Sequence, residues 1–348
     1  MAKSAVVGVV GATGAVGAEV VKVLHDRKFP LAEVKLFASE RSADRQIATP
    51  FGATTVRRFE AEAAGKCDIV FLCVSGDFAR EHAKALARTA LVIDSSSAFR
   101  LARDVPLVIP EINPQALAGA RLVANPNCTM AVAAMALWPL HRAFGLRKAI
   151  IASYQAASGA GAKGISELLE GARAYLDGKP APHSVFAHPL AFNVIPHIDR
   201  FLDNGYTNEE MKVMLEMRKV FNEPELAVSC TAVRVPTIRA HAEAITIETE
   251  RPISPKSARA VLEKAPGVRL VDDVASNAYP MPITAGERYD VDVGRIRTSL
   301  IFGAHGLDLF VCGDQLLKGA ALNAVQIAEV LASDYLETKA PKLRVVSK

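Results

Sequence analysis

A glycine-rich turn near the N-terminus constrains the fold more than any other feature of the sequence. The apolar run before it, residues 5–10, has the continuous hydrophobicity of a strand that is buried on both faces. The turn spans residues 11–17, Gly-Ala-Thr-Gly-Ala-Val-Gly, and a helical stretch over residues 18–27 follows it. Strand, glycine turn and helix in this order are typical of a dinucleotide site, in which the diphosphate lies at the helix N-terminus. We therefore predict a parallel sheet that binds a dinucleotide at its first turn.

More strands and helices alternate after this turn. Residues 34–38, 69–74 and 91–94 are short apolar runs that predict further strands. A helical stretch over residues 77–87 separates the last two, which gives the strand–helix–strand pattern of a parallel α/β sheet. Ligands of such sheets bind beyond the carboxyl ends of the strands. Arg100 follows one of these ends in a polar loop, so it is a candidate anion ligand, with a surface charge as the alternative.

The residues after the predicted second strand bear on the choice of dinucleotide. A cofactor with a free ribose 2′-hydroxyl requires an acidic residue at this position. The chain instead has Ser39, Arg41 and Ser42, and an arginine between serines suits a 2′-phosphate. Glu40 leaves an alternative open, because its carboxylate could bind the hydroxyl, and a solvated polar loop is a third interpretation. We favour the phosphorylated cofactor, NADP.

A second motif, Asn-Pro-Asn-Cys-Thr-Met at residues 125–130, indicates covalent chemistry. Residues 121–124 before it predict a strand, and residues 130–140, rich in Ala, Met and Leu, predict a helix. Cys128 therefore lies at a helix N-terminus, where free N–H groups and the helix dipole favour the nucleophilic thiolate. The alternative is a small buried hydrophobe. That interpretation suits the cysteines that lie within apolar runs, namely Cys67, Cys73 and Cys312.

Length and composition exclude several classes of protein. A chain of 348 residues favours two domains. The net charge of +4 is small and no run of Lys and Arg occurs, so nucleic acid is not an expected partner. No segment approaches the ~20 apolar residues that span a bilayer. Five cysteines at irregular spacings, with no Cys-x-x-Cys pair, predict neither disulfides nor a metal site and favour the reducing cytoplasm.

Further polar residues lie at the ends of predicted strands in the second half of the chain. Residues 150–155 predict a strand that ends at Gln155, and the small residues 156–161 allow close approach of the backbone to a ligand. Gln155 could donate to a developing oxyanion or to a substrate carboxylate. Residues 226–233 predict another strand, and Arg234 follows it as a candidate carboxylate clamp.

A histidine and a charged helix complete the candidates. A lone histidine is more often structural than catalytic, but the presence of Cys128 makes His241 a candidate proton carrier. A capping box at residues 207–210 predicts a helix start. Glu209 and Lys212 are three residues apart on one face of that helix, where a solvated ion pair is the alternative to a ligand site.

Taken together, these motifs closely resemble those of aspartate-β-semialdehyde dehydrogenase. They occur in the family's order over nearly the whole chain, at residues 11–17, 125–128, 153–159, 191–196, 234–236 with His241, and 313–315. Thr129 and Met130 depart from the Ser-Thr that usually follows the family's cysteine, at a position where we expect only packing. The resemblance implies NADPH-dependent reductive dephosphorylation of aspartyl phosphate to aspartate semialdehyde through a cysteine thioester, in lysine, diaminopimelate, threonine and methionine biosynthesis.

The resemblance also implies a role for each candidate residue. The catalytic residues would be Cys128 as nucleophile, His241 as general acid/base, and Gln155. The substrate ligands would be Arg234 for the α-carboxylate, Glu209 for the α-amino group, Arg100 and Lys212 for the phosphate, and Asn127. The NADP contacts would be Gly11, Thr13, Gly14, Ala15, Val16, Ser39, Arg41, Ser42, Ser158, Gly159 and Gln315.

The implied fold is α/β, with an N-terminal Rossmann-type parallel sheet domain and a C-terminal α+β catalytic and dimerisation domain. We place the NADP-binding domain at residues 1–127, completed by a C-terminal helix at 314–338, and the catalytic domain at 128–313. The family suggests a homodimer that acts on small molecules. Two alternatives stand beside this interpretation. N-acetyl-γ-glutamyl-phosphate reductase shares the chemistry, but its cysteine typically follows Pro-Gly rather than Asn127, and a non-catalytic nucleotide-binding paralogue would lack Cys128.

Overall fold

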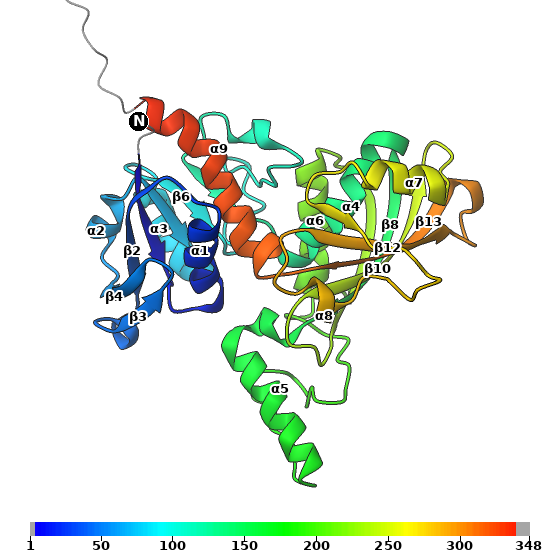
Figure 1. Cartoon of the computed structure of the whole chain (residues 1–348), viewed down its shortest axis with the longest axis horizontal. Coiled ribbons are helices and arrows are strands. Elements are labelled where there is room, and N and C mark those ends of the chain that lie inside the picture. The colour runs from blue at the N-terminus through cyan, green and yellow to red at the C-terminus, as the bar shows by residue number, and fades with distance from the viewer. Residues whose placement is uncertain (1–3, 339–348) are drawn as a thin grey trace, which may run out of the picture.

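The computed structural model describes residues 4–338, which form two sheets flanked by helices (Figure 1). The strands are β1 (Ala5–Val10), β2 (Leu31–Ala38), β3 (Gln46–Thr49), β4 (Gly52–Arg58), β5 (Ile69–Leu72), β6 (Leu91–Asp94), β7 (Leu122–Ala124), β8 (Leu146–Gln155), β9 (Ala227–Arg234), β10 (His241–Thr249), β11 (Val268–Leu270), β12 (Val291–Thr298) and β13 (Gly306–Gly313). The α-helices are α1 (Ala15–Asp26), α2 (Ala61–Gly65), α3 (Gly76–Leu86), α4 (Cys128–Phe144), α5 (Gly161–Leu176), α6 (Asn208–Phe221), α7 (Pro255–Leu262), α8 (Pro282–Ala285) and α9 (Leu322–Thr338). A π-helical turn at Leu317–Ala321 precedes α9.

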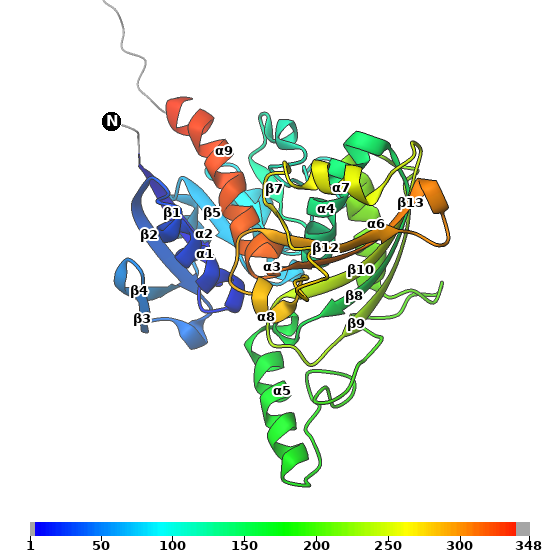
Figure 2. The ribbon, with the colours of Figure 1, turned by 45° about the vertical axis from the view of Figure 1, so that its right-hand side comes forward.

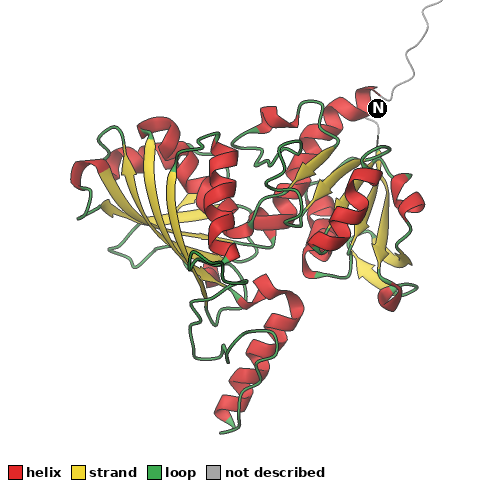
Figure 3. Ribbon diagram, turned by 180° about the vertical axis from the view of Figure 1, so that it is seen from behind, coloured by secondary structure: helices red, strands yellow, loops and turns green. Residues whose placement is uncertain are grey.

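The N-terminal sheet has the strand order β3-β4-β2-β1-β5-β6-β7 and is parallel except at the β3–β4 hairpin. Apolar residues of α1 and α9 pack on one face, and those of α2 and α3 pack on the other (Figure 3). Burial on both faces explains the continuous apolar runs of its central strands. The carboxyl ends of β1, β5, β6 and β7 meet at one edge, and the next residues are Gly11, Cys73, Ser95 and Asn125.

The second sheet has the order β11-β12-β13-β10-β8-β9 and is antiparallel at its centre. Helices α4, α6 and α7 cover one face (Figure 2), and α4 is buried over most of its length. On the other face the side chains of Ile150 and Tyr154 from β8 remain 48% and 36% exposed. Helix α5 and the loop after it project away from both sheets (Figure 1).

The chain passes from one sheet to the other between β7 and α4, and it returns between β13 and α9. β7 ends at the edge of the first sheet, and α4 begins four residues later beneath the second. After β13, the π turn carries the chain back to α9, which packs beside α1. The cysteine motif and the segment around Gln315 therefore lie at the junction of the two sheets.

The α/β class and the two sheets agree with the fold predicted from sequence, but some elements differ. β2 begins at Leu31 rather than at residue 34, because residues 31 and 33 pair with β1 although they precede the apolar run from which the strand was predicted. The hairpin β3–β4 was not predicted, because its strands are polar and half-exposed and lack an apolar run. The capping box at residues 207–210 is confirmed at the start of α6. Within residues 4–338, no helix has both the length and the apolar composition to cross a membrane.

Candidate active site

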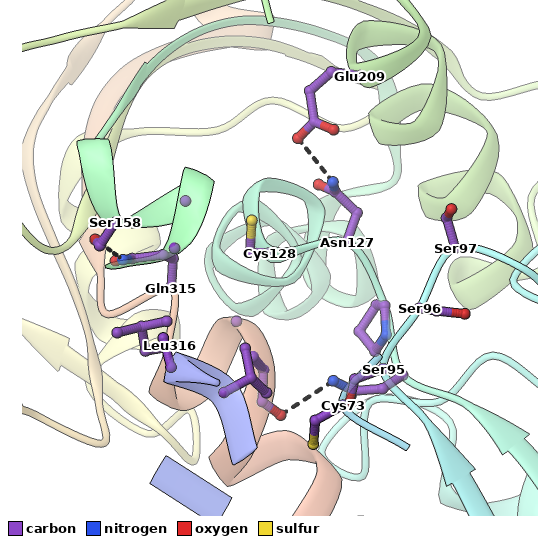
Figure 4. Close-up of a pocket in the computed structure, with 18 of the residues that line it drawn as sticks. Cys73, Ser95, Ser96, Ser97, Asn127, Cys128, Ser158, Glu209, Gln315 and Leu316 are labelled. Atoms are coloured by element: carbon purple, nitrogen blue, oxygen red, sulfur yellow. Dashed lines mark hydrogen bonds between the residues drawn. The ribbon is translucent and has the colours of Figure 1, made fainter. Parts of the chain in front are cut away.

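A cavity of about 490 Å³ lies between the carboxyl edge of the first sheet and the ends of β8 and β9 in the second (Figure 4). Most of the residues predicted from sequence line it: Gly14, Ala15, Val16, Arg100, Asn127, Cys128, Gln155, Ser158, Gly159, Glu209, Lys212, Arg234 and Gln315. Six predicted residues do not line it, namely Gly11, Thr13, Ser39, Arg41, Ser42 and His241. Five of these belong to the first turn and to the segment after β2. The sixth, His241, is fully buried beside Cys128.

Cys128 is the first residue of α4, and its sulfur points into the cavity (Figure 4). Asn127 caps the helix, since its side-chain oxygen accepts from the Met130 N–H at 3.0 Å. Asparagine is among the best N-cap residues for this reason. The amide nitrogen of Asn127 donates to Glu209 Oε1 at 2.8 Å. The cap thus fixes the start of the helix and ties it to α6.

His241, the first residue of β10, lies 3.5 Å from the cysteine, measured from Nε2 to Sγ. The ring is fully buried, and its Nδ1 accepts from the Ala156 N–H at 3.1 Å, which orients Nε2 toward the sulfur. A side chain at Gly159 would place its Cβ 2.7 Å from Arg234 Nη1 and 3.3 Å from His241 Cε1. A larger residue here would thus displace the Arg234 guanidinium and crowd the histidine.

The acid–base balance of the pair differs from the expectation. Burial, reinforced by the Glu209 carboxylate, raises the pKa of the Cys128 thiol to about 11, against the opposing effects of Arg100, Arg234 and Thr129. The helix N-terminus is expected to favour the thiolate, whereas burial favours the neutral thiol. Burial and Arg234 hold the pKa of His241 well below its usual value. Both shifts favour the neutral forms, a thiol beside an uncharged imidazole.

This state predicts how the alkylation rate of Cys128 depends on pH. Only the thiolate reacts with iodoacetamide, and with a thiol pKa of about 11 the thiolate fraction grows about tenfold per pH unit between about pH 7 and pH 9. We expect the labelling rate of the Cys128 peptide, followed by mass spectrometry, to rise in that proportion without levelling off. A plateau in this range would contradict the assignment, because it would place the pKa where the helix terminus alone would put it.

Glu209 connects three predicted residues. Its Oε1 accepts from Asn127 Nδ2 at 2.8 Å and from Gln155 Nε2 at 3.4 Å, and its Oε2 lies 3.7 Å from Lys212 Nζ. The side chain is only 10% exposed, so the alternative of a solvated helix pair does not describe it. Lys212 Nζ also donates to Asp199 Oδ2 at 2.7 Å, which holds the ammonium group at the cavity wall.

The two predicted arginines reach the cavity from different sheets. Arg100, beyond β6, donates to the carbonyl oxygens of Asn125 and Ser95 at 2.9 and 3.1 Å. Arg234, at the end of β9, donates from Nη1 to the Ala156 carbonyl at 2.7 Å, and its guanidinium lies 5.6 Å from the Phe186 ring centroid. A bound anion with two acidic groups could therefore meet a fixed guanidinium on each side.

The first turn fits a dinucleotide diphosphate. Gly11 has a φ of +84°, and a Cβ there would lie 2.2 Å from the Cys73 carbonyl oxygen, so only glycine closes this turn. Gly14 precedes α1, whose first turn has neither a side-chain cap nor an acidic residue. The first N–H groups of α1 are thus free of side-chain acceptors and suit a phosphate. Thr13 beside them is exposed.

The other predicted cofactor residues lie in two places, at the turn after β2 and around Gln315. Ser39 and Arg41 are exposed at the short turn after β2, and Ser42 is half-buried. At the opposite end, the Gln315 amide nitrogen contacts Ser158 Oγ, and its oxygen accepts from the Ala240 N–H at 2.8 Å (Figure 4). Gln315 thereby joins the loop after β8 to Ala240, the residue immediately before His241.

Several lining residues were not predicted. Ser95, Ser96 and Ser97 line the cavity (Figure 4), as Arg100 does, and the buried Glu216 contacts both Arg100 and Asn127. One signal for Glu216 is present in the sequence, because it lies seven residues after Glu209 and therefore on the same face of α6. Its partners, however, are distant in sequence, so the residue type and spacing alone do not indicate what it contacts.

Comparison with known proteins gives a consistent result. The NAD-binding domain of the semialdehyde dehydrogenases matches residues 6–120, and their dimerisation domain matches residues 137–318. Aspartate-semialdehyde dehydrogenases of Aquifex aeolicus and of a Synechocystis strain are 44% and 43% identical to this chain, over 91% and 90% of it and 94% and 93% of their own lengths. The crystal structure of aspartate semialdehyde dehydrogenase II from Vibrio cholerae, complexed with ASA, superposes with a TM-score of 0.91 at 39% identity, covering 96% of this chain and 99% of that one.

Proposed function

The chain belongs to the aspartate-semialdehyde dehydrogenase family, and on that premise we propose that it reduces aspartyl phosphate reversibly to aspartate semialdehyde and phosphate with NADPH. The observation that carries the proposal is the cysteine at the N-terminus of α4, 3.5 Å from a buried histidine, in a cavity with an arginine from each sheet. In this role the enzyme supplies an intermediate for the biosynthesis of lysine, threonine and methionine.

The residues around the cysteine support a two-step reaction. The sulfur of Cys128 attacks the acyl carbon, the bond from that carbon to the phosphate oxygen breaks, and a thioester forms as phosphate leaves. The glycine turn before α1 and Gln315 would hold the dinucleotide, which would supply the hydride needed to reduce the thioester. The resulting thiohemiacetal collapses to the aldehyde and restores the sulfur, and Nε2 of His241 is placed to exchange protons with both the sulfur and the substrate oxygen. The thioester replaces one difficult displacement by two easier ones.

The charged groups of the cavity match the ends of this substrate. Arg234 suits the α-carboxylate, and Glu209 suits a free α-amino group because its buried carboxylate lines the cavity. Arg100 and Lys212 suit the phosphate, with the serines of residues 95–97 beside them. Gln155, 2% exposed at the end of β8, is placed to donate to the substrate near Cys128.

Phosphate-dependent oxidation of aspartate semialdehyde tests this function. We expect NADP reduction in the presence of aspartate semialdehyde and inorganic phosphate, with kcat/KM about a hundredfold above that for N-acetylglutamate semialdehyde, because an acetylated amine offers no ammonium group to the Glu209 carboxylate. A preference for the acetylated substrate would favour N-acetyl-γ-glutamyl-phosphate reductase. Dinucleotide binding without turnover of either substrate would identify a non-catalytic paralogue.

Arg41 supports NADP as the preferred dinucleotide. The guanidinium is exposed at the turn after β2, and Ser39 and Ser42 flank it. We expect Arg41→Ala to raise KM for NADP about tenfold and KM for NAD less than twofold, since a charge-assisted contact to phosphate is lost. Arg88→Ala is the matched control, because Arg88 is an exposed arginine at the opposite edge of the same sheet. Equal effects of Arg41→Ala on both dinucleotides would rule out contact with the 2′-phosphate and make Glu40 the residue to examine.

Two further properties complete the proposal. The match of residues 137–318 to a dimerisation domain supports a homodimer. The five cysteines are all free thiols, as is usual for proteins of a reducing compartment, and we place the enzyme in the cytoplasm.

A further inference from the structure

Glu216 is a buried carboxylate that contacts two parts of the proposed site. It lies on α6, and its side chain is 1% exposed. Oε1 accepts from Arg100 Nη1 at 3.3 Å, and Oε2 accepts from the backbone N–H of Asn127 at 2.6 Å. Asn127 is the residue immediately before Cys128. One side chain therefore joins the proposed phosphate ligand to the cap of the nucleophile's helix.

The partners of Glu216 belong to two different segments of the chain. Arg100 is in the loop after β6, and Asn127 is in the segment between β7 and α4. The Nε and Nη2 atoms of Arg100 donate to the carbonyl oxygens of Asn125 and Ser95, so Glu216 supplies the contact that fixes the third nitrogen. The guanidinium is held in one orientation, with its plane set by groups from three segments.

Helix α6 also holds the backbone of the Arg100 loop. Lys219, one turn beyond Glu216, donates from Nζ to the carbonyl oxygens of Arg100, Ala102 and Val105 at 2.9, 2.7 and 2.7 Å. The charged groups that act on Glu216 are Arg100, Glu209 and Lys219. Burial raises the pKa of the Glu216 carboxyl group, whereas Arg100 and the hydrogen bond from the Asn127 N–H lower it. The side chain and the backbone of the arginine are thus both anchored on α6.

We propose that Glu216 is a positioning residue for the phosphate half of the reaction, fixing Arg100 relative to Asn127 and the sulfur that follows. This inference rests on the proposed function, in which Arg100 binds phosphate. Both partners of Glu216 are hydrogen-bond donors, so the site requires a group with two acceptors and no donor. A glutamine has the same shape but presents an NH₂ group to one of the two donors.

Glu216→Gln tests the proposal, and Glu210→Gln is a closely matched control. Glu210 is also buried on α6, and it also accepts from two donors, the N–H groups of Thr207 and Ala232, but it contacts neither Arg100 nor Asn127 in the described structure. We expect Glu216→Gln to raise KM for phosphate about tenfold, since a hydrogen bond to a charged group is lost. KM for aspartate semialdehyde and for NADP should change less than twofold, and Glu210→Gln should leave all three unchanged. Glu216→Asp, which keeps the charge but is one methylene shorter, should give a smaller rise.

Measuring Glu216→Gln in a protein that also carries Arg100→Ala distinguishes a positioning role of Glu216 from a general effect on stability. In Arg100→Ala, the substitution Glu216→Gln should add less than a twofold change in phosphate KM, because the group through which it acts is absent. A phosphate KM that is unchanged or lowered in Glu216→Gln, or that rises by the same factor in the Arg100→Ala background, would overturn the proposal.

Protection of Cys128 tests the same geometry without turnover. Inorganic phosphate should slow alkylation of Cys128 by iodoacetamide in the wild-type protein, and Glu216→Gln should raise the half-protecting phosphate concentration about tenfold. Failure of the semialdehyde assay with this protection intact would reject the proposed function and leave the role of Glu216 standing. Absence of protection in the wild type, or an equal half-protecting concentration in both proteins, would overturn the role.

Discussion

Cys128→Ala is expected to lower kcat by about 10⁴-fold or more while NADP binding stays within about twofold of the wild type. The nucleophile of a covalent mechanism has no substitute when its side chain is removed, and losses of this size follow removal of such groups in other enzymes. The glycine turn before α1 is a separate segment from the start of α4, so loss of the thiol leaves the dinucleotide contacts in place. Steady-state kinetics and a calorimetric titration with NADP measure the two effects.

Cys67→Ala is the control for this substitution. Cys67 is also a free, buried cysteine, but it packs against Phe37 and Gly8 in the first sheet, outside the cavity. We expect the control to retain most of the wild-type kcat. Substantial turnover by purified Cys128→Ala would exclude covalent catalysis at this residue.

Arg234→Lys is expected to raise KM for aspartate semialdehyde about 30-fold or more, even with saturating phosphate. Arg234 is a buried residue, 7% exposed, and its guanidinium is oriented by contacts with the Ala156 carbonyl and the Phe186 ring. A planar fork of donors can grip a carboxylate through two bonds, which a lysine ammonium cannot reproduce. Loss of a charge-assisted bond in a buried site costs about 1.5–3 kcal/mol, and misplacement of the reacting carbon lowers kcat in addition.

Arg100→Ala provides the comparison for Arg234→Lys. Because Arg100 lies at the edge of the first sheet and Arg234 at the end of β9, their effects should separate by co-substrate. We expect Arg100→Ala to raise the apparent KM for phosphate and for arsenate, with a much smaller effect on that for the semialdehyde. The reverse pattern, a semialdehyde defect from Arg100→Ala and a phosphate defect from Arg234→Lys, would show that the two assignments are exchanged.

Much of the fold could be predicted because its signals are local. The first turn combines a buried strand, glycines required by the backbone and a helix within 23 residues, 5–27, so the pattern is complete without knowledge of distant contacts. The hairpin β3–β4 could not be predicted in the same way. Its strands are half-exposed, and only the pairing of β4 with β2 fixes their place in the sheet.

In the site, too, the features that could be predicted are those that depend on neighbouring residues. The position of Cys128 at a helix start follows from neighbouring residues, but its pKa depends on burial and on Glu209, 81 positions away in the sequence. The contacts of Glu216 likewise join residues separated by 89 and 116 positions. Local patterns identify which side chains can do chemistry, whereas the protonation states and the positioning groups arise only from tertiary packing.

A thioester on Cys128 is the centre of this mechanism, and a single-turnover experiment without phosphate tests it most directly. Aspartate semialdehyde and NADP are mixed with the enzyme, the reaction is quenched in acid, and both the reduced cofactor and the Cys128 peptide are measured. We predict a burst of about one equivalent of NADPH per active site and an aspartyl adduct on Cys128 that added phosphate discharges. Turnover with phosphate present, but without a burst and without an adduct on Cys128 when phosphate is absent, would contradict the thioester mechanism.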